Sequence, residues 1–272
     1  MEKTITSEDR SIFYQVIGKG EPVVLLHGFT EDGQIWNKQV PFLEKDYQLI
    51  IPDLPGSGFS ELALDVSMEA MATLIKAILD EENISETIIV GHSMGGYVTL
   101  AFAEKYPEVL RGFGLFHSTA YPDPDEKKES RQKNIRFIES HGTYEFLKQA
   151  IPGLFTDDFK SKHPEIVNGL IQQYRVFTPE ALSAYLTAMM QRPDRTEVLK
   201  KFVKPILFII GKHDNAIPFQ DSLQLCHLPS LSYIHILDDS AHMGMLEETE
   251  KSNNILREFL QDVHSRAQIF AS

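Results

Sequence analysis

Ser93 has the setting of an activated nucleophile. It lies in "GHSMG" (residues 91–95), a match to G-x-S-x-G, between the apolar run 86–92 and a helix-like stretch. A serine hydroxyl becomes a nucleophile when a neighbouring base accepts its proton. A sharp strand-to-helix turn with small flanking residues presents that hydroxyl at the edge of a sheet. The five-residue pattern is weak by itself, so its meaning depends on the partners that the chain supplies.

His242 is the histidine best placed to be the general base. It lies in "LDDSAHMGML", in a loop after the last strand-like run of the chain. This puts it at the same sheet edge as Ser93, and a loop lets the side chain reach across to the serine. We therefore expect His242 to accept the Ser93 proton.

Asp214 is the favoured acid. In "IIGKHDNAIP" it directly follows the strand-like run that precedes the run before His242. A carboxylate there fixes the tautomer of the base and stabilises the imidazolium, and the chain order serine, acid, base is the expected one. Asp238 and Asp239, close to His242 in sequence, and Asp123, after the next strand-like run beyond the serine, remain alternatives.

An acyl-transfer reaction also needs donors for the oxyanion. Residues 27–29, "HGF", end the first buried run in a turn whose N–H groups can face the site. The Phe29 amide and the Met94 amide at the start of the next helix are the expected pair. Each such donor typically contributes roughly 3–4 kcal/mol of transition-state stabilisation.

These residues require a sheet whose strands end at one edge. Short runs rich in β-branched and apolar residues predict buried strands at 21–28, 47–53, 86–92, 112–118, 204–211 and 231–237. Helix-like stretches lie between and after them, at 67–82, 95–108 and 245–266. Continuous apolar runs indicate strands covered on both faces. The alternation predicts an α/β fold with a mostly parallel sheet and helices on both faces.

Residues 121–196 break this alternation. They contain no strand-like run but several helical ones, punctuated by proline and glycine. We expect a helical cap inserted into a core domain formed by residues 1–120 and 197–272. The cap contains 11 acidic and 11 basic side chains, so it is not an electrostatic funnel of either sign.

Composition excludes several functions. A net charge of −13 argues against nucleic acid or anionic lipid as a partner. No stretch has the eighteen or so uninterrupted apolar residues of a membrane helix, and "MEKTITSEDR" lacks the apolar region of a secretory signal; a cytoplasmic protein is expected. Cys226 is the single cysteine, which excludes an internal disulfide and a cysteine metal cluster. Nothing indicates the oligomeric state.

The chain resembles the α/β-hydrolase-fold family over its whole length, and within it the serine esterases with a helical cap. The resemblance rests on five motifs in the right order: "HGF" (27–29), "DLPGSGFS" (53–60), "GHSMGG" (91–96), "GKHDNAIP" (211–218) and "SAHMGMLEE" (240–248). It implies an eight-stranded, mostly parallel sheet, a cap over the site, no cofactor and no metal. It also implies the same roles for the five site residues named above.

The serine nucleophile favours acyl chemistry, because dehalogenases and epoxide hydrolases of this fold attack with aspartate. Hydrolysis of a small carboxylic ester through an acyl-enzyme is the expected reaction. A thioester, a lactone, a carbon–carbon bond, peracid formation and acyl transfer use similar machinery and stay open. So does a non-catalytic ligand-binding role, which has less need of a complete set of groups.

The expected partner is a small-molecule acyl substrate in an apolar pocket. Large apolar residues beside the catalytic loops or in the cap are candidates for its lining, together with Phe29 and Met94: Trp36, Tyr121, Met189, Met190 and Met243. Such a cap suggests a confined pocket, so short acyl chains are expected to react best.

Overall fold

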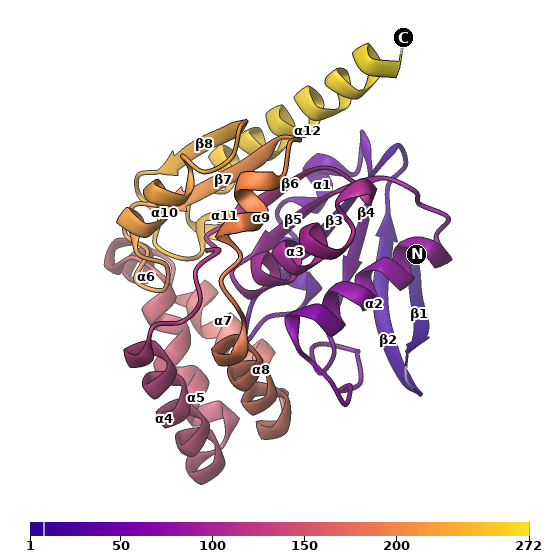
Figure 1. Ribbon diagram of the computed structural model, residues 1–272. Coiled ribbons are helices and arrows are strands. Elements are labelled where there is room, and N and C mark those ends of the chain that lie inside the picture. Colours follow the sequence, from indigo (N-terminus) through magenta and orange to yellow (C-terminus); the bar gives the residue numbers. More distant parts are fainter. Residues whose placement is uncertain (8, 272) are drawn as a thin grey trace.

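The architecture is one twisted sheet with helices on both faces (Figure 1). The computed structural model describes residues 1–7 and 9–271. In these residues the sheet has eight strands: β1 (Glu2–Ser7), β2 (Arg10–Ile17), β3 (Glu21–Leu26), β4 (Tyr47–Pro52), β5 (Thr87–His92), β6 (Leu110–Phe116), β7 (Ile206–Gly211) and β8 (Ser232–Leu237). Their order is β1-β2-β4-β3-β5-β6-β7-β8. Strands β3 to β8 are parallel, while β2 is antiparallel to both of its neighbours. The predicted fold class is confirmed.

The six strands predicted from apolar runs are all present. Every residue of β5 and of β7 is buried, as strands covered by helices on both faces must be. The residue pattern missed β1 and β2, the edge hairpin at one side of the sheet. In β2 only alternate residues, Ile12, Tyr14 and Val16, are buried, so the strand lacks the continuous apolar run that marks the others.

The helices predicted at 67–82, 95–108 and 245–266 are present, the last one divided in two, and in the described residues the structure adds three short helices that the sequence did not predict, at 40–43, 196–201 and 219–225. The α-helices in the described residues are α1 (Val40–Leu43), α2 (Met68–Glu81), α3 (Met94–Lys105), α4 (Asp125–His141), α5 (Thr143–Ala150), α6 (Asp157–Lys162), α7 (Pro164–Tyr174), α8 (Pro179–Gln191), α9 (Thr196–Lys201), α10 (Phe219–Leu225), α11 (Gly244–Glu247) and α12 (Thr249–Ala271). Ser67 caps α2 by accepting from the Ala70 amide at 3.2 Å. The stretch expected as one helix over 245–266 is two, because the chain leaves helical geometry at Glu248.

In the sequence, helices α4 to α8 lie between β6 and β7. In space they form a separate group beside the sheet (Figure 1). The Arg195 amide donates to the Ala120 carbonyl at 2.9 Å, so the chain leaves and re-enters the sheet region at adjacent points. Helix α9 begins at Thr196, the last residue of the expected cap, and packs on α3.

The strand order creates a crevice at β3. After β3 the chain turns to β4 on one side, and then returns to β5 on the other. Loops that follow such neighbouring strands diverge, and open parallel sheets bind ligands in the resulting crevice at the carboxyl ends of the strands. The loop after β3 and the turn after β5 lie on the two sides of this crevice, and residues of both, Phe29 and Ser93 among them, line one cavity. Across the described part of the chain, no helix combines the length and apolar character needed to cross a membrane.

Candidate active site

Ser93 occupies a strained turn between β5 and α3. Its backbone has φ +50° and ψ −114°, a region that non-glycine residues rarely adopt and that costs about 1–3 kcal/mol. Two hydrogen bonds hold it there. The Ser93 amide donates to the Phe116 carbonyl at 2.9 Å, and the Ser93 carbonyl accepts from Ser118 Oγ at 2.8 Å.

The glycines of the motif allow the chain to pass close to itself. A Cβ on Gly91 would lie 2.2 Å from the Gly95 carbonyl oxygen, and one on Gly95 would lie 2.6 Å from the carbonyl oxygens of Leu26 and His27. Atoms of the backbone cannot yield as a flexible side chain can. Small residues on both sides are therefore a steric condition for exposing Ser93 at the end of β5.

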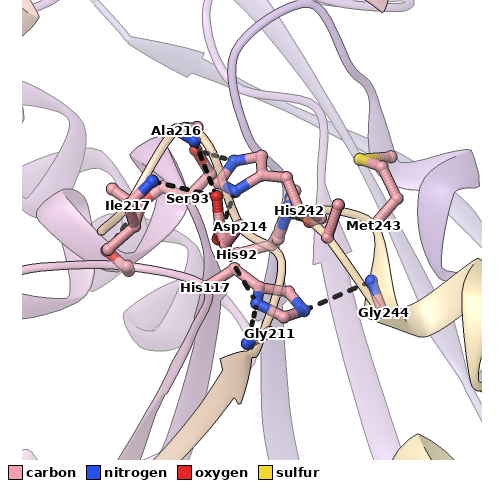
Figure 2. Close-up of polar contacts among 12 residues, drawn as sticks. His92, Ser93, His117, Gly211, Asp214, Ala216, Ile217, His242, Met243 and Gly244 are labelled. Carbon is pink, nitrogen blue, oxygen red and sulfur yellow. Dashed lines mark hydrogen bonds and ion pairs between the residues drawn. The ribbon is translucent and has the colours of Figure 1, made fainter. Parts of the chain in front are cut away.

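Ser93, His242 and Asp214 form a continuous hydrogen-bond chain (Figure 2). His242 Nε2 lies 2.9 Å from Ser93 Oγ, and His242 Nδ1 lies 2.8 Å from Asp214 Oδ2. The carboxylate accepts from Nδ1, which leaves Nε2 free to accept the serine proton. The other carboxylate oxygen of Asp214 accepts from the Ala216 and Ile217 amides at 2.8 and 2.9 Å.

The environment of Asp214 keeps it ionised. Burial raises the pKa of this carboxyl, but its interaction with His242, including the hydrogen bond from Nδ1, and the hydrogen bond from the Ile217 amide outweigh burial and lower it. The alternative acids are engaged elsewhere. Asp123 is buried against Arg131 and Arg192. Asp238 is exposed and pairs with Lys212 and Lys251. Asp239 is exposed, and its amide donates to Glu248.

A buried ion pair that the sequence reasoning missed lies beside Ser93. His92 Nδ1 is 2.9 Å from Glu31 Oε2, and His92 Nε2 is 2.9 Å from the His242 carbonyl oxygen. Both partners are acceptors, so both ring nitrogens donate and the ring is charged. Burial lowers the pKa of His92, but Glu31 and the His242 carbonyl outweigh burial and raise this pKa. Burial raises the pKa of Glu31, but His92 and the Gly28 amide outweigh burial and lower it.

His117, directly after β6, is the second residue that the sequence reasoning missed. Its Nδ1 accepts from the Gly211 amide at 3.0 Å, and its Nε2 faces the Gly244 amide at 3.2 Å (Figure 2). If the ring were charged, both ring nitrogens would carry a hydrogen, and each would point at the N–H group of a backbone amide. Burial, with the neighbouring His242 and His92, lowers the pKa of His117 far below its usual value. The two histidines that flank His242 therefore differ in charge.

The loop after β3 lies against Ser93. A Cβ on Gly28 would lie 3.1 Å from Ser93 Cβ, and the Gly28 amide donates to Glu31 at 2.6 Å. Phe29 follows directly, so its amide belongs to the part of the loop that lies against the serine. Met94 is the first residue of α3, and the first N–H groups of a helix have no acceptor within it.

The loop of His242 is held from the inserted segment. The His242 amide donates to the Leu154 carbonyl at 2.9 Å. Glu247 accepts from the Thr156 amide at 2.8 Å and from the Ala241 amide at 2.9 Å. The position of His242 therefore depends on the segment of the chain between β6 and β7 as well as on the sheet.

A cavity of about 180 Å³ opens on Ser93 and His242. Its apolar lining is drawn from the β3 loop and the inserted helices: Phe29, Phe146, Ala150, Leu154, Leu186 and Met189. Of the expected pocket residues, only Phe29 and Met189 line it. Trp36 is fully buried with its ring against Phe116, 5.9 Å between centroids.

The other residues expected to line the pocket also do not line this cavity. Met94 and Met243 are buried in the core, and Met190 and Tyr121 pack against the core at other points. The sequence placed them near the catalytic loops, but the direction of each side chain depends on the helix or turn that carries it. Among the described residues, no group of three or more histidine, cysteine or acidic side chains is arranged to hold a metal ion.

The chain matches known proteins over nearly its whole length. Residues 21–141 match the family described as alpha/beta hydrolase fold. A thermophilic esterase from Thermogutta terrifontis, whose structure was solved with malate bound, superposes with a TM-score of 0.91 at 30% identity, covering 97% of this chain and 99% of that one. An enol-lactonase from Burkholderia xenovorans LB400 has a TM-score of 0.89 at 20% identity, covering 95% and 100%, which shows a shared fold.

Two of the curated relatives are hydrolases whose length the match covers almost completely. The 2-hydroxy-6-oxo-6-phenylhexa-2,4-dienoate hydrolase of Comamonas testosteroni is 27% identical, with 93% of this chain and 92% of that protein covered. The pimeloyl-[acyl-carrier protein] methyl ester esterase of Methylococcus capsulatus is 25% identical, with 92% and 98% covered. The chain therefore belongs to the alpha/beta-hydrolase-fold family of enzymes.

Proposed function

We propose that this protein hydrolyses a small carboxylic ester through a Ser93–His242–Asp214 triad and an acyl-enzyme. The observation that carries the proposal is the hydrogen-bond chain from Ser93 Oγ through His242 to Asp214, 2.9 and 2.8 Å. The 30% identity to an esterase over nearly the whole chain supports the ester bond in particular.

In the first half of the reaction, Ser93 Oγ attacks the ester carbonyl while its proton passes to His242 Nε2. Asp214 stabilises the imidazolium that forms. The amides of Phe29 and Met94 donate to the oxyanion of the tetrahedral intermediate. The intermediate collapses, His242 returns the proton to the leaving alcohol, and the acyl group stays on Ser93.

In the second half, water takes the place of the alcohol. His242 accepts a proton from this water, the resulting hydroxide attacks the acyl carbonyl, and the same amides stabilise the second oxyanion. Collapse releases the carboxylic acid, and His242 returns its proton to Ser93 Oγ. The cycle consumes one ester and one water and gives one acid and one alcohol.

The inserted helices act as a cap in this proposal, with residues 121–196 enclosing a substrate between themselves and the sheet. The cavity volume of about 180 Å³ is below the roughly 300–1,000 Å³ typical of sites for drug-sized ligands, which supports a small substrate. Helices α4, α5 and α8 all contribute to its wall, so opening of the cap would admit the ester.

The test is a panel of p-nitrophenyl esters from acetate to long-chain acids, with thioester, lactone and vinylogous diketone members, run on wild type and Ser93→Ala. We expect the highest kcat/KM on short-chain esters and no turnover by Ser93→Ala. The diketone is included because the relative from Comamonas testosteroni is named for such a substrate. Faster cleavage of long chains than of acetate or butyrate would contradict the confined pocket.

A fluorophosphonate probe tests the nucleophile without any choice of substrate. It should label wild type at Ser93 and leave Ser93→Ala unlabelled. Absence of labelling in wild type, or equal labelling of both proteins, would overturn the proposal.

A further inference from the structure

One wall of the catalytic cavity is polar and basic. Lys127, Arg131 and Asn134 of α4 line the cavity, and their spacing of four and three residues places them on one face of the helix. The remainder of the lining from the inserted helices is apolar. Lys127 and Arg131 are both half-buried, and placing charged groups where water is partly excluded is costly, so this basic wall requires a reason beyond packing.

Arg131 belongs to a cluster with an excess positive charge. Its Nε donates to Asp123 Oδ2 at 2.5 Å, and Arg192 Nη1 lies 2.8 Å from Asp123 Oδ1. Burial raises the pKa of Asp123, but the two guanidinium groups outweigh burial and lower it, so the carboxyl is ionised. Two guanidinium groups facing one carboxylate leave one net positive charge.

Lys127 adds a second positive charge. Its Nζ donates to the Ala216 carbonyl at 2.6 Å, which uses one of the three ammonium N–H groups. No carboxylate of the described residues forms an ion pair with Lys127, whereas the next residue, Lys128, lies 3.8 Å from Asp125. The ammonium group at the cavity therefore lacks a counter-ion from the described chain.

The other charged groups at the cavity do not neutralise this wall. Glu31 is paired with His92 and also accepts from the Gly28 amide, and Asp214 is bonded to His242. The excess positive charge at α4 is a local feature of a protein whose net charge is −13. It faces the space that the substrate must occupy.

We propose that Lys127 and Arg131 form a subsite for a carboxylate carried on the acyl chain of the substrate, so that the preferred substrates are half-esters of short dicarboxylic acids. The inference rests on the proposed ester hydrolysis and names its substrate class. Carboxylates match the planar donors of arginine and the ammonium of lysine. An enclosed cavity strengthens the attraction, because little water screens it.

The test compares two esters of the same shape, monomethyl glutarate and methyl glutaramate, in which an amide replaces the carboxylate. The measured quantity is the ratio of kcat/KM for the charged ester to that for the neutral ester, followed by methanol release. We expect wild type to prefer the charged ester. Lys127→Met should lower the ratio roughly tenfold to a hundredfold, since a hydrogen bond to a charged group is typically worth that much.

Lys128→Met is the matched control. It removes the same charge from the adjacent position of α4, but Lys128 is not part of the cavity wall, so the ratio should stay at the wild-type value. A ratio that Lys127→Met leaves unchanged, with both esters slowed equally, would overturn the subsite; Lys127 would then act only by holding the Ala216 turn. An equal loss of preference in both variants would also overturn it.

Binding separates this inference from the proposed function. Calorimetry with Ser93→Ala, and with Ser93→Ala combined with each lysine variant, measures affinity for the same two esters without turnover. Tighter binding of monomethyl glutarate that is lost with Lys127→Met supports the subsite, even if wild type cleaves neither ester. In that case only the proposed reaction is contradicted. Cleavage of both esters with equal kcat/KM and equal affinity would remove the subsite and leave the proposed reaction standing.

Discussion

His92 donates a hydrogen bond from Nε2 to the backbone carbonyl of His242 over 2.9 Å, and the ring of the same His242 lies 2.9 Å from Ser93 Oγ. The opposite nitrogen of His92 donates to Glu31, which also accepts the Gly28 amide. One buried ion pair therefore joins the loop of the proposed oxyanion donor Phe29 to the loop of the proposed base. Its side chains are only 1% and 3% exposed, so water cannot replace either partner.

Replacement of Glu31 should impair both stability and catalysis. Glu31→Ala leaves a buried imidazolium without its counter-ion, and removal of one partner from a buried pair typically costs about 3–5 kcal/mol. Glu31→Gln should cost less, because its amide oxygen can still accept the Gly28 N–H and a neutral His92 can still donate to the His242 carbonyl. Urea unfolding and kcat on a short-chain ester measure the two effects.

Glu139→Ala is the control for this series, since Glu139 is an exposed residue of α4 and exposed substitutions typically change the free energy of unfolding by no more than about 0.5 kcal/mol. If Glu31→Ala unfolds at the same urea concentration as Glu139→Ala, the ion pair does not contribute as we infer.

The pair also predicts how stability depends on pH. The folded pKa of His92 is raised above its usual 6.5, so its contribution is complete below pH 6.5 and is lost as the pH rises through the folded value. The folded pKa of Glu31 is lowered below its usual 4.5, so its contribution is present above pH 4.5 and is lost as the pH falls through the folded value. Both contributions are complete between these values.

The double variant Glu31→Gln, His92→Gln removes both titrating groups and isolates this effect. The free energy of unfolding of wild type minus that of the double variant should be largest between about pH 4.5 and 6.5 and should decline on either side. Each unit by which a folded pKa differs from the unfolded one changes this free energy by about 1.4 kcal/mol. A difference that stays constant from pH 4 to 9 would contradict the charge assigned to the pair.

Asp214→Asn should lower kcat by roughly 10³–10⁴-fold while the protein still folds. The amide oxygen of the new side chain is needed by the Ala216 and Ile217 amides, which turns its NH₂ group toward His242. His242 Nδ1 must then accept a hydrogen bond, so the ring proton moves to Nε2. With that proton in place, Nε2 cannot accept the proton of Ser93.

The exposed Asp238 supplies the control for this substitution. It lies closer to His242 in sequence but pairs with lysines on the surface, so Asp238→Asn should retain nearly full kcat. Circular dichroism verifies folding of both variants. A kcat for Asp214→Asn within tenfold of wild type would show that another group orients the base.

The sequence was most informative where one physical requirement dominates. Apolar runs located six of the eight strands in the described residues, and positions in the loops after β5, β7 and β8 identified Ser93, Asp214 and His242 as side chains at one edge. The structure brings these three together. The hairpin of β1 and β2 was missed because a half-exposed edge strand does not carry that signal.

Side-chain direction was not predictable in the same way. Met189 lines the cavity, whereas the adjacent Met190 does not, because neighbours on a helix point about 100° apart and the sequence does not give the rotation of the helix. Glu31 and His92 are distant in sequence, and their pairing depends on β3 lying beside β5. The available signals in the sequence were an acidic residue two positions after Phe29 and a histidine directly before Ser93. Neither signal identifies the partner of the residue.

The close packing of the nucleophile turn predicts opposite effects for two glycine substitutions. In Gly91→Ala, the new Cβ would lie 2.2 Å from the Gly95 carbonyl oxygen, so the turn must open, and we expect at least tenfold loss of kcat together with a lower Tm. A Cβ on Gly169, inside α7, would meet no neighbouring atom within 4 Å. Gly169→Ala should therefore stabilise the protein by roughly 0.5–1 kcal/mol, because alanine loses less conformational entropy in a helix. Scanning calorimetry and ester turnover measure both variants. Equal Tm shifts of the same sign would contradict the steric role of Gly91.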